Sequence, residues 1–164
     1  MTRRRWAMAM MLALAAGGGG VAGAQQQRPA PADRGGNDIS PVHDPVLMRE
    51  KGVYHLFSTG IGPAGQGVVS ERVSTDLVNW RAGTPPFAKL PAWAVKAIPG
   101  AGNMWAPDIS FVNGRYRLYY SVSTFGSNRS AIGLATNATL NPKARGYGWR
   151  DEGLVVMSTP GEDF

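Results

Sequence analysis

The sequence predicts an all-β protein of the β-propeller class, built from repeated four-stranded units. One order of residues occurs twice: an Asp, a short apolar run, a turn with Gly, then Tyr-x-Leu-aromatic and small hydroxyl residues. Asp44 and Asp108 are 64 residues apart, and Tyr54 and Tyr116 are 62 apart. This spacing suits a four-stranded blade and is too long for a helical solenoid unit. The first unit also lacks apolar residues at helical spacing, which favours strands.

The first unit is predicted to run from about residue 38 to residue 86. Short β-rich runs are bounded by turn residues, and strands are expected at 45–49, 53–59, 67–73 and 80–81. Glu50, Lys51 and Gly52 are expected to form a tight turn between the first two strands.

A loop-like connector is predicted at residues 87–103, because prolines at and near its ends cannot donate to a sheet ladder. The second unit is expected at about 104–158, with Asn113-Gly114 as a two-residue hairpin turn. Tyr116, Leu118 and Tyr120 should share one face of its second strand. Its four strands are expected at 108–112, 115–123, 130–136 and 149–157.

The N-terminus is typical of a secretory signal peptide at residues 1–24. A basic segment, Arg3 to Arg5, precedes an apolar run at 6–16, and the small residues Ala22-Gly23-Ala24 offer a cleavage site. A retained membrane anchor is the alternative, but the apolar run is short for a membrane span. Residues 25–37 read as a disordered leader. We therefore expect a secreted protein, extracellular or periplasmic, that does not associate with a membrane once it is cleaved near Ala24.

Composition excludes some kinds of chemistry. The chain has no cysteine, so it has neither disulfides nor thiolate metal sites. Its formal charge of +6 includes Arg3 to Arg5, and the other basic residues are scattered along the sequence. Scattered cations indicate a solvated surface, so no nucleic-acid partner is expected.

Three features are candidates for function. Pro45 is expected to push Asp44 into an extended conformation at the entrance of a strand, where the carboxylate could act as a catalyst. Asp108 could pair with Asp44 as the acid and base of a glycosidase, or both could simply begin equivalent strands. The loop with Phe125 and Gly126 could let a sugar ring stack on an aromatic face, or it could be a plain turn.

Several segments together resemble glycoside hydrolase family 43, and within it the secreted endo-1,5-α-L-arabinanases. The resemblance spans roughly residues 40–164, with the motifs in family order. The segments that carry it are 43–45, 54–60, 105–109, 119–123 and 125–136.

The resemblance implies a five-bladed propeller and an inverting mechanism that acts on arabinan or arabino-oligosaccharides. Asp44 matches the general base, whereas Asp108 matches an aspartate that shapes the pocket wall and is not catalytic. Trp105 and Phe125 match aromatic positions of the arabinan cleft, and Gly126 lets a sugar approach the backbone. No cofactor is implied for the chemistry, although a structural Ca²⁺ or similar ion could lie at the axis of the intact propeller. An exo-acting arabinosidase or β-xylosidase, or a non-catalytic carbohydrate-binding propeller, stays open as an alternative.

The chain departs from the family in what it lacks. The aspartate that modulates the acid's pKa, the general-acid glutamate and the histidine of the metal site have no counterparts in the sequence. We therefore expect an N-terminal part of an enzyme, inactive as written, with about two of the blades. Because two blades leave one face uncovered, a polypeptide of residues 25–164 is expected to aggregate or to be partly molten.

Overall fold

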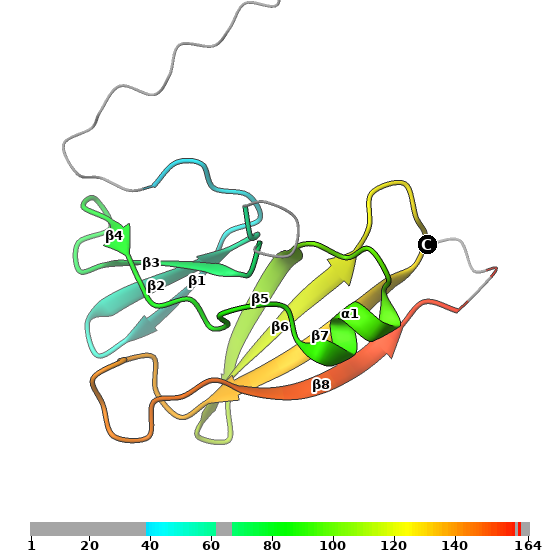
Figure 1. Cartoon of the computed structure of the whole chain (residues 1–164). Helices are drawn as coiled ribbons and strands as arrows, with labels where there is room; N and C mark the ends of the chain where they lie inside the picture. Colours follow the sequence, from blue (N-terminus) through cyan, green and yellow to red (C-terminus); the bar gives the residue numbers. More distant parts are fainter. Residues whose placement is uncertain (1–38, 62–66, 160, 162–164) are drawn as a thin grey trace, which may run out of the picture. The chain divides into compact units, whose positions relative to one another are not determined.

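The computed structural model describes residues 39–61, 67–159 and 161, all within one compact unit, Pro31–Phe164. The predicted signal peptide at 1–24 and leader at 25–37 lie outside these residues. The described part is built mainly from two four-stranded antiparallel sheets, which we call blade one and blade two (Figure 1). No helix in the described ranges has the length and apolar character needed to cross a membrane.

Blade one has the strand order β1-β2-β3-β4. Lys51 and Gly52, at φ 45° and 87°, form the tight turn predicted between its first two strands. The third strand begins later than the predicted residue 67, because Gly67 instead forms an isolated bridge with Asn103, just before blade two. The strands are β1 (Val46–Glu50), β2 (Val53–Ser58), β3 (Ser70–Ser74) and β4 (Arg81–Ala82).

Blade two has the strand order β5-β6-β7-β8. The predicted hairpin is confirmed, since Asn113 and Gly114 have φ 52° and 75°, as a two-residue turn of this kind requires. The first strand starts four residues before the predicted Asp108, because an irregularity between Trp105 and Asp108 lets pairing continue past Pro107. The strands are β5 (Met104–Val112), β6 (Arg115–Ser123), β7 (Ser130–Asn137) and β8 (Arg150–Met157).

The connector between the blades contains a helix, so the prediction of a loop throughout 87–103 is wrong. Helix α1 (Ala92–Ala97) begins directly after Pro91 and ends before Pro99. Proline is tolerated at the start of a helix because the first amides have no intrahelical partner. The two prolines therefore bound the helix without interrupting it. Figure 1 shows α1 beside β7 and β8, which it contacts.

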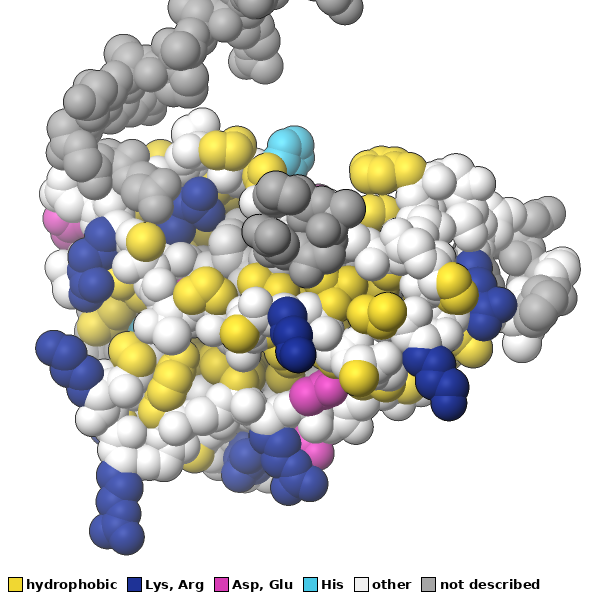
Figure 2. Space-filling model, viewed as in Figure 1, with side chains coloured by type: hydrophobic (Ala, Val, Ile, Leu, Met, Phe, Trp, Pro, Cys, Tyr) yellow, Lys and Arg dark blue, Asp and Glu magenta, His cyan; other side chains and the backbone are white. Residues whose placement is uncertain are grey.

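The core is one cluster of buried side chains to which β6, α1 and blade one all contribute. Tyr116, Leu118 and Tyr120 are buried on one face of β6, as their alternation predicts, and belong to this cluster with Phe57 of blade one. Phe87 and Trp93 pack against the ring of Tyr120. On the face shown in Figure 2, the Lys and Arg side chains lie as separate groups.

The pairing registers show which residues of the two blades are equivalent. Val46 pairs with Phe57 in blade one, and Asp108 pairs with Tyr119 in blade two. Both pairs, and those that follow to each turn, are related by a constant shift of 62 residues. The alignment of Asp44 with Asp108 is therefore wrong by two residues: Asp44 corresponds to Ala106.

Candidate active site

Asp44 lies at the entrance of β1, directly before Pro45, with its side chain exposed. Its φ is 51°, so the extended conformation predicted from Pro45 is wrong. Asp is one of the few residues other than Gly that adopt this left-handed region, at a cost of about 1–2 kcal/mol. Strained positions of this kind cluster at functional sites. The positive φ therefore makes Asp44 a candidate whose role is decided by the contacts of its side chain.

Thr59, just after β2, holds the Asp44 carboxylate. Its Oγ1 donates a hydrogen bond to Asp44 Oδ2 at 2.5 Å and accepts one from the Ala106 amide at 2.8 Å. Its own amide donates to the His43 carbonyl at 3.0 Å. One side chain thus links the entrance of blade one to the entrance of blade two.

Comparison with blade two shows whether the backbone at this position needs a carboxylate. Ala106, at the position equivalent to Asp44, also precedes a proline and also has a positive φ, of 42°. The same backbone entrance therefore forms without a carboxylate. The alternative that Asp44 only begins a strand does not explain why this position holds an Asp.

Trp105 and Phe125 form an aromatic pair next to this network. Their ring centroids are 5.0 Å apart, with the planes inclined by 47°. Trp105 is half-buried at the start of β5 and directly precedes Ala106, whereas Phe125 is 93% exposed. An exposed aromatic surface beside a carboxylate suits a sugar, whose apolar face stacks on the rings.

The loop that carries Phe125 is shaped by a glycine turn and anchored to α1. Gly126 turns the chain with φ 74°, and an added Cβ would meet nothing within 4 Å, so the turn itself requires glycine there. Arg129 Nε donates to the Ala97 carbonyl at the end of α1, at 2.8 Å. Helix α1 therefore anchors the loop that presents the aromatic ring.

Asp108 is exposed on β5 and pairs with Tyr119, while Trp105 pairs with Ser121. Opposed residues and their second neighbours share one face of a sheet, so Asp108 and Trp105 lie on the same face of blade two. Among the described residues, no hydrogen bond joins Asp108 to Asp44. The structure thus links Asp44 through Thr59 to Ala106, the neighbour of Trp105, and pairs Trp105 with Phe125. Asp108 lies further along the strand.

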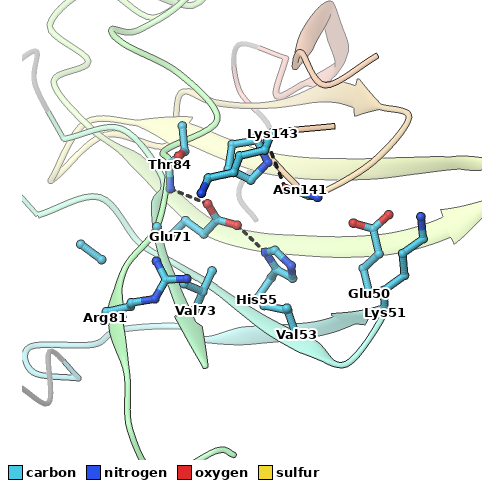
Figure 3. A pocket seen from close by; sticks show the side chains of 13 residues that line it. Glu50, Lys51, Val53, His55, Glu71, Val73, Arg81, Thr84, Asn141 and Lys143 are labelled. Carbon is cyan, nitrogen blue, oxygen red and sulfur yellow. Dashed lines mark hydrogen bonds and ion pairs between the residues drawn. The ribbon is translucent and has the colours of Figure 1, made fainter. Parts of the chain in front are cut away.

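A separate pocket of about 410 Å³ lies near the β1–β2 turn (Figure 3). At its floor His55 Nδ1 lies 2.7 Å from Glu71 Oε1, and Glu71 Oε2 accepts the Thr84 amide at 2.7 Å. His55 is 3% exposed, so its side chain is packed inside the protein. Both ends of the Glu71 carboxylate are used inside the protein, so we assign the pair to folding.

The described residues do not form a metal site by themselves, since they contain no cluster of three or more potential His, Asp or Glu ligands. The ion suggested for the axis of an intact propeller stays a prediction.

Sequence reasoning missed the roles of Thr59 and Arg129. Thr59 stood in the motif at 54–60, and the blades share a hydroxyl residue at this position, because Ser121 is its equivalent. Arg129 gave no signal, since its partner is a backbone carbonyl 32 residues away.

Comparison with known proteins identifies the family. The model described as "Glycosyl hydrolases family 43" matches residues 39–163. The extracellular exo-α-(1→5)-L-arabinofuranosidase ArbA of Cellvibrio japonicus is 46% identical over 124 residues, which cover 75% of this chain and 34% of that protein. The extracellular endo-α-(1→5)-L-arabinanase 1 of Bacillus subtilis is 39% identical over 138 residues, or 83% of this chain and 41% of that protein.

A solved structure agrees. The α-L-arabinanase of Cellvibrio cellulosa complexed with arabinohexaose has a TM-score of 0.67 and 47% identity, covering 74% of this chain and 37% of that chain. The predicted class is confirmed: the chain holds part of a five-bladed β-propeller. It spans about a third to two fifths of the length of the relatives it matches. The chain belongs to glycosyl hydrolase family 43.

Proposed function

We propose that the protein to which this chain belongs is a secreted glycosidase that cleaves α-1,5-linked L-arabinofuranosyl bonds with inversion. The observation that carries the proposal is the exposed Asp44 carboxylate, held by Thr59, whose hydroxyl also binds the amide next to Trp105 of the Trp105–Phe125 aromatic pair. The names of the relatives support the substrate, since they are called arabinanases and arabinofuranosidases and one was solved with arabinohexaose.

In the proposed reaction Asp44 is the general base. It removes a proton from a water molecule as that water attacks the anomeric carbon, while a general acid protonates the leaving oxygen on the other side of the ring. An inverting site separates these two carboxyl groups by about 6.5–9.5 Å, which leaves room for the water. The rings of Trp105 and Phe125 bind the sugar, and Asp108 shapes the wall. The described residues thus supply the base and part of the binding surface.

We propose that the protein acts outside the cytoplasm. The basic and apolar pattern at residues 1–24 supports export, and two relatives are named extracellular. Both endo- and exo-acting enzymes occur among the relatives. The motif block at 125–136 favours endo cleavage.

The test is the substitution Asp44→Ala in the complete product of the gene, assayed on linear arabinan. A missing general base lowers turnover by about 10²–10⁴-fold, while binding of arabino-oligosaccharides should stay within about twofold. Asp76→Asn is the control, because Asp76 is an exposed aspartate that closes a turn in blade one. Full turnover by the Asp44→Ala protein would refute the base.

The wild-type product decides the broader proposal. Release of arabino-oligosaccharides from linear arabinan supports endo cleavage, and release of single arabinose units would shift the proposal to exo cleavage. Binding without any cleavage of α-L-arabinofuranosides would refute the glycosidase and favour the non-catalytic propeller.

A further inference from the structure

We infer that Thr59 is a positioning residue, whose hydroxyl sets the orientation of the Asp44 carboxylate and ties it to the backbone of blade two. The inference rests on the proposed function, in which Asp44 is the base.

The direction of the hydrogen bonds fixes the carboxylate. A threonine hydroxyl has one proton. Because the Ala106 amide donates to Oγ1 at 2.8 Å, the hydroxyl proton is left for Asp44 Oδ2, 2.5 Å away. Hydrogen bonds from a hydroxyl to an ionised carboxylate are short and strong. Among the described residues Oδ1 has no hydrogen-bond partner, so it is the oxygen available to the attacking water.

Three backbone hydrogen bonds hold the segment that contains Thr59 and the start of β5 beside it. The Thr59 amide donates to the His43 carbonyl at 3.0 Å, and the next amide, of Gly60, donates to the Met104 carbonyl at 2.9 Å. The Met104 amide in turn donates to the Gly67 carbonyl at 2.7 Å. The hydroxyl is therefore presented from a segment with little freedom, as an orienting group requires.

Blade two shows that a hydroxyl at this position has another use when the carboxylate is absent. Ser121, the equivalent of Thr59, donates its hydroxyl to the Trp105 carbonyl at 2.9 Å. Trp105 is the equivalent of His43, whose carbonyl in blade one accepts the Thr59 amide. In blade one the hydroxyl is turned to Asp44 instead. The hydroxyl thus donates to a carboxylate in the blade that has one and to a backbone carbonyl in the blade that does not, although the backbone pairing is equivalent in both.

The experiment compares Thr59→Val, which removes the hydroxyl, with Thr59→Ser, which keeps it, in the complete gene product acting on linear arabinan. Misplacing a reacting group by about 1 Å costs on the order of 10²-fold, so kcat should fall about 10- to 100-fold in Thr59→Val. KM should stay within about twofold, because the aromatic pair is unchanged. Thr59→Ser should restore kcat to within about threefold of wild type.

The matched control is Thr139→Val. Thr139 also donates its hydroxyl to a carboxylate, that of Glu50, at 3.0 Å, away from Asp44. Its loss should leave kcat unchanged. An unchanged kcat in Thr59→Val, a rise in KM alone, or equal damage in Thr59→Ser and Thr59→Val would overturn the inference.

A crystal structure of the Thr59→Val protein separates this inference from the proposed function. The Asp44 carboxylate should have turned from its wild-type orientation whether or not the wild-type protein cleaves arabinan. An unmoved carboxylate would overturn the positioning role even in an active enzyme. If Thr59→Val does not fold, Thr59→Ala removes the same hydroxyl with less bulk and is read by the same criteria.

Discussion

Phe125 offers a test in which binding and folding separate. Its side chain is 93% exposed, so its removal should change the free energy of unfolding by no more than about 0.5 kcal/mol. Its ring instead lies 5.0 Å from the ring of Trp105, where the two form a surface for a sugar. We expect Phe125→Ala to weaken binding of arabino-oligosaccharides and leave stability nearly unchanged.

The size of the effect follows from the geometry of the pair. An aromatic contact of this kind contributes about 0.5–1.5 kcal/mol beyond its area. Since about 1.4 kcal/mol corresponds to a tenfold change in affinity, binding should weaken about 2- to 12-fold. The assay is the KM for linear arabinan of the complete gene product, or the affinity for arabino-oligosaccharides by calorimetry. The kcat at saturation should change little.

The chain contains a matched control in Phe111. It is 54% exposed, and its ring lies 4.7 Å from that of Tyr116 at 49°, which nearly reproduces the distance and angle of the Trp105–Phe125 pair. Phe111 lies at the opposite end of β5, next to the Asn113-Gly114 turn. Phe111→Ala should leave KM unchanged. Equal weakening by both substitutions, or none by Phe125→Ala, would refute the role of the pair as a sugar platform.

Four further results are expected, each measured on the complete gene product unless stated. Glu71→Ala should lower the free energy of unfolding in urea by about 1–3 kcal/mol, because it leaves the buried His55 Nδ1 and the Thr84 amide without their hydrogen-bond partner; Glu71→Gln should cost less. Gly133→Ala should cost about 1–3 kcal/mol, because a Cβ would lie 2.5 Å from Tyr120 Cζ and from Trp93 Cζ2; a neutral result would contradict the packing. Burial and the nearby Asp151 raise the pKa of Tyr120 far above the ordinary 10.0. The protonated Tyr120 hydroxyl therefore stabilises the folded state fully below pH 10, and this stabilisation is lost as the pH rises above 10. Between pH 8 and pH 11 the melting temperature should fall more steeply in wild type than in Tyr120→Phe. A polypeptide of residues 25–164 should aggregate on size-exclusion chromatography, because four successive residues of β8, 154–157, are exposed and apolar; a cooperative, monomeric melt would contradict this.

The strands were predictable because their signals are local. The Asn113-Gly114 turn determines the hairpin register, and the alternation along β6 determines which side chains enter the core. The second strand of blade two was predicted at 115–123 and found at Arg115–Ser123. Helix α1 was missed because six residues are too few to show a helical period, and its burial depends on packing against distant strands.

Residue type alone predicts the wrong equivalence between the two blades. Asp44 and Asp108 share a residue type, but Pro45 and Pro107 share a backbone role and are 62 residues apart, as are Tyr54 and Tyr116. The prolines therefore held the correct register. The hydrogen bonds of Thr59 were out of reach, because they join residues 15 and 47 positions away in the chain.

The corrected register shows how one repeated backbone yields an asymmetric site. At the two equivalent entrance positions blade one has His43 and Asp44, and blade two has Trp105 and Ala106. Asp44 and Ala106 have the same left-handed conformation before a proline, so the backbone geometry is shared and only the side chains differ. Blade one thus contributes a carboxylate and blade two an aromatic ring.

The hydrogen bond from the Ala106 amide to Thr59 Oγ1 joins the two entrances. A carboxylate at position 106 would lie in the equivalent place in blade two, yet Ser121 there donates its hydroxyl to the Trp105 carbonyl. A second base in blade two would therefore need both a carboxylate at position 106 and a Ser121 hydroxyl turned toward it. The repeated backbone can for this reason supply one base without supplying two.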